Sequence, residues 1–117
     1  MAEQLGSHLP LSSAALHILL ALAGEDLHGY GIMQEIARQS EGIYKLGPGT
    51  LYDNLQKLVP AGWVQELGPR RGDGDSRRRY YRLTDAGRDV LGAETARLTQ
   101  VVREARLRLR VPNPRRV

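Results

Sequence analysis

Several residue types are missing or scarce in this chain, and each absence excludes a class of function. The 117 residues include no cysteine, which excludes disulfides, thiolate metal sites and thiol nucleophiles. Phenylalanine is absent and tryptophan occurs once, so a deep aromatic core cannot form. The longest apolar run, residues 14–23, is interrupted by His17 and is too short to span a bilayer. Because the first three residues also lack the positive charge of a signal peptide, we expect a cytoplasmic protein that does not bind membranes.

The sequence also contains no catalytic or metal-binding pattern. His8, His17 and His28 fall on separate segments, and none has metal-ligand spacing to another histidine or to a carboxylate pair. The glycine-rich segment 72–75 lacks the lysine of a P-loop and the glutamate of an EF-hand, and its two aspartates would repel phosphate. We therefore expect a protein that is not an enzyme and that needs neither a metal nor a cofactor.

Charge is distributed unevenly along the chain. Residues 1–66 hold three basic and seven acidic side chains, whereas residues 67–117 hold fourteen basic and six acidic ones. The formal net charge of +4 is therefore concentrated in the second half. A basic region of this kind favours an anionic polymer as partner.

The segment from Gly47 to Gly62 predicts a short amphipathic helix. Pro48 suits the first helical position, and Pro60 disfavours helical geometry at the preceding residue. One face is apolar and must meet a core: Leu51, Leu55 and Leu58. The opposite face is polar, with Tyr52 and Asn54 at its flanks: Gly49, Thr50, Asp53, Gln56 and Lys57. A solvated surface helix would show the same pattern, so the function of this helix depends on the segment after it.

The chain after this helix predicts a β-hairpin with basic residues. Residues 63–67 read as one strand, residues 68–76 as a long polar loop, and residues 78–83 as a second strand with Tyr81 and Leu83 on one face. A helix followed by such a hairpin is the arrangement of a winged helix-turn-helix, in which one helix enters a DNA groove beside an arginine-bearing wing.

The chain resembles the PadR family of transcriptional regulators from about residue 11 to about residue 91. The motifs that carry the resemblance are His28-Gly29-Tyr30, Gly49-Thr50-Leu51-Tyr52 with Leu55 and Leu58, Gly62, and Tyr80-Tyr81-Arg82-Leu83-Thr84-Asp85-Ala86-Gly87. The resemblance implies a mainly α (α+β) winged helix-turn-helix, a homodimer held by a C-terminal helix, and repression relieved by a small molecule. Two departures are Gly47, where the family often has a Ser or Thr cap, and Pro60, where it often has an acidic residue.

Three further helices complete the expected fold. Ser12 or Ser13 can cap a helix running to about Ala23, which is apolar on nearly every side and so should be covered partly by a second subunit. A second helix spans about residues 28–39. Its Tyr30 is equally compatible with a place in the core and with a contact to a DNA phosphate. The last helix follows the Thr84 cap and continues to about Arg110.

These elements define four expected segments and two sets of candidate residues. The segments are a flexible arm at 1–11, a DNA-binding domain at 12–83, a dimerisation helix at 84–110 and a disordered tail at 111–117. The candidate residues for double-stranded operator DNA are Tyr30, Lys45, Gly49, Thr50, Tyr52, Gln56, Lys57, Arg77, Arg78 and Arg79. The candidate dimerisation residues are Leu16, Leu20, Leu91, Leu98, Val101, Val102, Ala105 and Leu109.

Two functions remain open from the sequence. The first is a dimeric repressor that binds a palindromic operator and carries a small-molecule effector site at the subunit interface. The second is a winged-helix module that binds a protein or RNA without sequence-specific DNA recognition. Lys57 and the wing arginines favour DNA, whereas Asp53 is acceptable near phosphates only if it meets a base donor or a neighbouring basic side chain.

Overall fold

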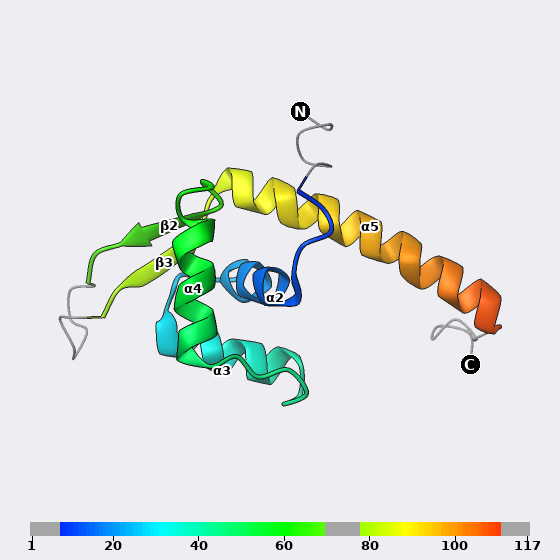
Figure 1. The fold of residues 1–117 in the computed structure, drawn as a ribbon, viewed down its shortest axis with the longest axis horizontal. Coiled ribbons are helices and arrows are strands. Elements are labelled where there is room, and N and C mark those ends of the chain that lie inside the picture. Colours follow the sequence, from blue (N-terminus) through cyan, green and yellow to red (C-terminus); the bar gives the residue numbers. More distant parts are fainter. Residues whose placement is uncertain (1–7, 70–77, 111–117) are drawn as a thin grey trace.

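Three of the four described helices begin after a residue whose side chain caps them, and the fourth does not. A computed structural model describes residues 8–69 and 78–110 (Figure 1). In α2 (Ser13–Leu22) the side chain of Ser12 accepts a hydrogen bond from the Ala15 amide at 3.1 Å. Helix α3 (Gly29–Gln39) is capped by His28, and helix α4 (Pro48–Leu58) starts at Gly47 without any side-chain cap. The cap at Gly47 is therefore the weak one that its sequence predicts.

Helix α2 lies at the centre of the fold and is packed by α3, α4, α5 and β3 (Figure 1). Its residues Ile18 and Leu19 are fully buried. They join the inner residues of the neighbouring elements in one core, among them Ile32, Ile36, Leu51, Leu55, Leu58 and Leu83. The helix is not covered on every side, because Leu20 remains 41% exposed.

The predicted hairpin is confirmed and carries a third strand on its other edge. Strands β2 (Val64–Leu67) and β3 (Tyr80–Leu83) pair antiparallel, with Val64 opposite Leu83. Strand β1 (Leu27–His28) pairs with the free edge of β3, which gives the order β1-β3-β2. From the sequence, residues 25–27 are expected only to connect two helices, because a two-residue strand has no periodicity of its own.

An ion pair fixes this third strand beside the hairpin. Asp26, just before β1, accepts hydrogen bonds from Arg82 of β3, the shortest at 2.8 Å. Arg82 points away from the core because its neighbours Tyr81 and Leu83 point inward. The hydrogen bonds and the negative charge of Asp26 raise the pKa of the Arg82 guanidinium.

Helix α5 (Asp85–Leu109) follows the sheet directly, with one residue between them. That residue, Thr84, accepts a hydrogen bond from the Gly87 amide and donates its hydroxyl to the carbonyl of Gly62. Its own amide donates to the carbonyl of Trp63 at 3.1 Å. A Cβ atom at Gly87 would overlap the Trp63 carbonyl, so glycine permits this close approach.

The N-terminal arm contacts the side of α5. The amide of Leu11 donates to Glu94 at 2.9 Å, and the ring of His8 lies edge-on to Trp63 at 5.0 Å. Glu94 is only 1% exposed, and Arg97 donates to both of its oxygens. The hydrogen bond from Arg97, supported by the Leu11 amide, holds the Glu94 pKa below its ordinary value.

Some expected features lie outside the described residues. These are Arg77, the hairpin tip at 72–76, the first seven residues of the arm and the tail at 111–117. Within the described ranges, the structure contains no helix that is both long enough and apolar enough to cross a membrane.

Candidate nucleic-acid interface

Helix α4 presents one polar face to solvent. Burial of Leu51, Leu55 and Leu58 against the core fixes the rotation of the helix about its axis. The residues predicted for DNA on the opposite face are consequently exposed, as is Asp53 between them: Gly49, Thr50, Gln56 and Lys57. Lys45, three residues before Pro48, is exposed as well. This exposure is a requirement for groove binding, and it leaves the assignment of individual DNA contacts a prediction.

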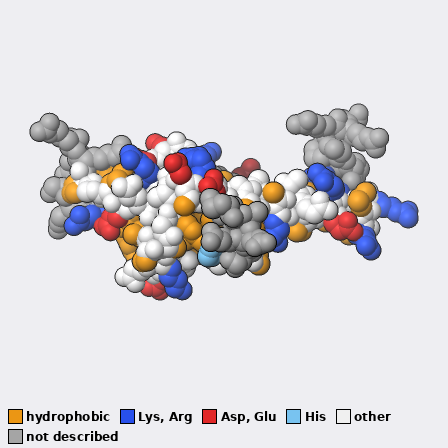
Figure 2. Space-filling view, turned by 90° about the horizontal axis from the view of Figure 1, so that it is seen from above, with side chains coloured by type: hydrophobic (Ala, Val, Ile, Leu, Met, Phe, Trp, Pro, Cys, Tyr) orange, Lys and Arg blue, Asp and Glu red, His pale blue; other side chains and the backbone are white. Residues whose placement is uncertain are grey.

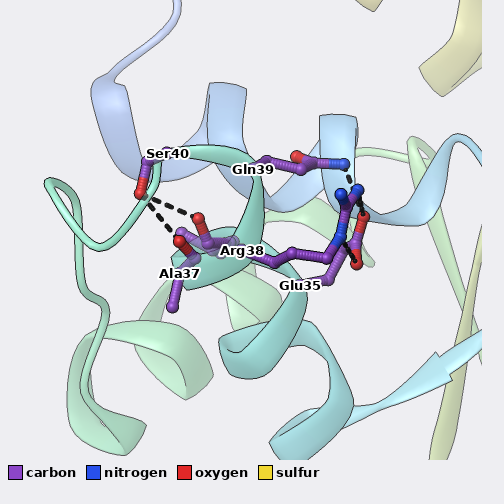
Figure 3. A network of polar contacts seen from close by, with 6 residues as sticks. Glu35, Ala37, Arg38, Gln39 and Ser40 are labelled. Atoms are coloured by element: carbon purple, nitrogen blue, oxygen red, sulfur yellow. Dashed lines mark hydrogen bonds and ion pairs between the residues drawn. The ribbon is translucent and has the colours of Figure 1, made fainter.

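The turn between α3 and α4 is organised by the hydroxyl of Ser40 (Figure 3). Ser40 accepts a hydrogen bond from the Tyr44 amide at 3.0 Å and lies within donating distance of the Ile36 and Tyr44 carbonyls. The ring of Tyr44 stacks on His17 of α2, with centroids 4.2 Å apart. The start of α4 is thereby held against the core.

The outer face of α3 carries its own polar network near this turn (Figure 3). Arg38 donates to Glu35 at 2.6 Å, and Gln39 donates to the same carboxylate at 2.9 Å. The hydrogen bond from Arg38 lowers the pKa of Glu35. Because the pair is local and exposed, its role is to support the last turn of α3.

Tyr52 connects α4 to the start of α3. A Cβ atom at Gly29 would overlap the Tyr52 hydroxyl, so the glycine lets this ring lie against the start of α3. The helical periodicity predicts Tyr52 on the flank of the polar face, and the ring is indeed 45% exposed. Tyr52 therefore has both a packing contact and an open side toward solvent.

A hollow of about 260 Å³, which we name the junction hollow, lies where α3, α4 and the wing meet. The residues that border it include His28, Gly29, Tyr30, Tyr52, Arg78 and Arg79. Tyr30 is 62% exposed, which removes it from the core. The structure thus brings together four predicted DNA residues that are up to 49 positions apart in sequence: Tyr30, Tyr52, Arg78 and Arg79.

Two residues of this region are absent from the predicted site residues. His28 borders the junction hollow, although the sequence indicates it only as part of the His28-Gly29-Tyr30 motif and gives it no role of its own. Tyr81 is buried at the same place, and that burial raises the pKa of its hydroxyl. Both positions depend on β3 pairing with β1 and β2, which is a tertiary property.

A second hollow of about 430 Å³ lies between α2 and α5 and is lined almost entirely by apolar side chains. Leu16, Leu20, Leu91, Leu98 and Val102, all predicted for dimerisation, line it with Thr95 and Thr99. The remaining three are exposed in the C-terminal half of α5: Val101, Ala105 and Leu109. Hydrophobic side chains lie along the projecting part of α5 beside basic ones (Figure 2).

Among the described residues, no group of three or more His, Asp or Glu side chains is placed to hold a metal ion. The charged groups at the junction hollow are guanidinium groups, which bind anions.

Sequence comparison relates the chain to known regulators. Residues 18–93 match the transcriptional regulator PadR-like family. Transcriptional regulator Rv3488 of Mycobacterium tuberculosis is 34% identical over 93 residues, which cover 80% of this chain and 82% of that protein.

Comparison with solved structures supports the fold. A PadR family transcription regulator from Clostridium difficile R20291 aligns with a TM-score of 0.69 at 20% identity, covering 84% of this chain and 98% of that one. Bacillus subtilis PadR in complex with operator DNA aligns with a TM-score of 0.60 at 23% identity. That alignment covers 69% of this chain and 45% of the Bacillus protein.

Proposed function

The chain belongs to the PadR-like family of DNA-binding transcriptional regulators, and from this premise we propose that it is a homodimeric repressor released by a small molecule. The observation that most supports DNA binding is the junction hollow, where α4 and the wing arginines meet on one surface. A protein of this kind acts on chromosomal DNA, so we assign it to the cytoplasm. We assign residues 12–83 to DNA binding and residues 84–110 to dimerisation.

The dimer is proposed from the spacing of residues along α5. Intervals of four and three residues alternate without a break through Leu91, Thr95, Leu98, Val102, Ala105 and Leu109. Such spacing is typical of helices that pack in a left-handed coiled coil. Val102 is 48% exposed and Leu109 is 72% exposed in the single chain. Covering this face and the hollow beside α2 with a second copy would contribute several kcal/mol, at about 25 cal/mol per Å² of apolar surface.

The effector is proposed to bind between the subunits, at the hollow beside α2. Its walls are aliphatic, with the hydroxyls of Thr95 and Thr99 as polar groups. Residues 84–117 contain no aromatic side chain, so α5 cannot stack a planar ring. We therefore expect a compact apolar ligand. Titration with flat dyes, followed by Trp63 fluorescence, should give weak binding or none, and saturable tight binding would contradict this expectation.

The experiment that tests the function is a fluorescence anisotropy titration with duplex DNA from the promoter of the protein's own gene. Binding that persists in excess random duplex is the expected result. Sequencing the DNA that copurifies with the protein would identify the operator, and a two-fold related sequence in it would support the dimer. Equal affinity for all duplexes, with tighter binding to RNA or to an acidic protein, would favour the interaction-module alternative.

The repressor role needs a separate measurement. A reporter gene behind the identified operator should be expressed less when the protein is present. Higher expression in the presence of the protein would make it an activator and would leave the DNA-binding assignment intact.

A further inference from the structure

The cap of α3 determines which ring nitrogen of His28 accepts a hydrogen bond. Its Nδ1 atom lies 3.1 Å from the Gly31 amide, which is a hydrogen-bond donor. Nδ1 must therefore be unprotonated in order to accept this bond. In the neutral ring the proton then resides on Nε2, and His28 has one N–H donor left that the helix does not use.

The ring of His28 is also held in place by its neighbours. Its residue pairs with Tyr80 in the β1–β3 ladder, and the two rings meet edge-on with centroids 5.3 Å apart. A side chain fixed by a cap, a strand and a ring contact loses little conformational entropy when it binds a ligand. His28 is thus a preorganised donor at the edge of the junction hollow.

The other groups around the junction hollow suit a single anionic group. Arg78 and Arg79 supply positive charge from the wing, and Tyr30 and Tyr52 supply hydroxyl donors from α3 and α4. The carboxylate of Glu66 lies 3.8 Å from Arg79, and both side chains are well exposed. A pair so long and so solvated leaves the guanidinium able to turn toward a stronger anion.

We propose that the junction hollow binds one backbone phosphate of the bound DNA and that His28 donates a hydrogen bond to this phosphate from Nε2. This inference rests on the proposed DNA binding and adds a contact residue to it. This phosphate contact would not depend on DNA sequence, because a phosphate has the same chemistry at every step of the duplex. It would fix the register of α4 on the DNA by holding the wing, the start of α3 and Tyr52 to the same phosphate.

The first test separates the two roles of His28. Asparagine is a good N-cap but is too short to supply the Nε2 donor, so H28N should melt within a few degrees of the wild type. The same variant should bind operator duplex about three- to tenfold more weakly, as expected for a lost hydrogen bond. H28A should lose both stability and affinity. Wild-type affinity in H28N would overturn the proposal.

The second test uses the salt dependence of binding. Tyr30 and neutral His28 release no counterions, so Y30F and H28N should bind more weakly with an unchanged slope of log affinity against log salt. R79A should flatten that slope, whereas R103A, which removes the same charge from the exposed C-terminal half of α5, should leave it unchanged. If H28N flattened the slope as much as R79A does, a neutral donor role for His28 would be refuted.

The third test locates the phosphate. Single phosphates of the operator can be replaced with neutral methylphosphonate. At one position in each half-site, this replacement should weaken binding of the wild type but should not further weaken binding of H28N or Y30F. If the loss from phosphate replacement and the loss from the protein substitution added fully at every position, the proposed phosphate site would be refuted, and DNA binding would remain established. Failure of the wild type to bind any duplex would refute the proposed function, and the phosphate site with it.

Discussion

Glu94 is a fully buried carboxylate in the packed part of α5, and its partners explain why it is tolerated there. Burying a charge is costly unless the charge is paired and hydrogen-bonded. Arg97 provides the pairing, and the Leu11 amide provides a further hydrogen bond from a residue 83 positions away. This single side chain therefore attaches the N-terminal arm to α5.

We expect E94Q to lower the free energy of unfolding by about 1–2 kcal/mol at neutral pH, because the amide has one oxygen for the three N–H donors of Leu11 and Arg97. Urea unfolding at one fixed protein concentration measures this. Glu104, which pairs with Arg108 on the exposed surface of the same helix, is the matched control, and E104Q should change stability little. Equal effects of the two substitutions would show that burial of Glu94 is unimportant.

The lowered pKa of Glu94 gives a prediction about acid stability. A group whose pKa is lower in the folded state stabilises the protein above its unfolded-state pKa, and this contribution is lost as the pH falls through the folded value. The stability of wild type and E94Q should therefore differ at neutral pH and converge below the ordinary glutamate value of 4.5. A difference that stayed constant into acid would contradict the assignment.

At the scale of elements, the start of α5 depends on the absence of a side chain at Gly87. Alanine there would place a methyl group against the Trp63 carbonyl, a backbone atom that the sheet holds in place. G87A should lower the free energy of unfolding by about 2–4 kcal/mol. G92A is the control on the same helix, since a Cβ atom there meets nothing within 4 Å. It should stabilise the protein by about 0.5–1 kcal/mol, and a loss in both variants would point to another cause.

The wing and α4 should contribute differently to DNA binding. R78A and R79A should weaken binding to all duplexes and flatten the salt slope by about one unit for each phosphate that is no longer neutralised. Q56A should act on the operator more than on random DNA, since a base contact is worth about 1–3 kcal/mol of discrimination. Parallel titrations over a range of salt measure both effects. Wing variants that kept the wild-type slope would make the hairpin a solvated loop.

The elements could be predicted from the sequence wherever the signal is local. Ser12 and Thr84 mark helix starts through their own side chains, and the stripe of Leu51, Leu55 and Leu58 fixes which face of α4 is buried. Strand β1 could not be predicted, because its two residues become a strand only by pairing with Tyr80 and Tyr81. Local patterns determine where elements form, and long-range pairings determine how they join.

The candidate site follows the same division. Exposure of Thr50, Gln56 and Lys57 is a consequence of the periodicity of α4. The contact of Tyr52 with Gly29 and the position of His28 beside the wing arginines require residues from three elements. Contacts between separate elements cannot be predicted from local sequence patterns, and for this reason His28 is absent from the predicted site residues.

At the scale of the whole molecule, the apolar face of α5 should control the oligomeric state. L98D places a charge on the proposed coiled-coil face and should give monomers or aggregates in sedimentation experiments. L107D is the matched control, because Leu107 is 69% exposed and falls outside the repeat of intervals of four and three. It should leave the dimer intact. Dimers in both variants would require a different interface.

The direct passage from β3 through Thr84 into α5 has a mechanical consequence for such a dimer. The amide and the hydroxyl of Thr84 are both hydrogen-bonded to the Gly62–Trp63 segment, so the connection between the wing and α5 is short and fixed. In a dimer joined through α5, the two DNA-binding units would therefore be held at a fixed spacing. Binding would then depend on the distance between the half-sites as well as on their bases. One added base pair between the half-sites turns the second by roughly 34°, because the duplex completes a turn in about 10.5 base pairs. Affinity should then fall steeply although every base and phosphate contact remains available. The protein would thus discriminate the spacing between half-sites as strictly as their base sequence.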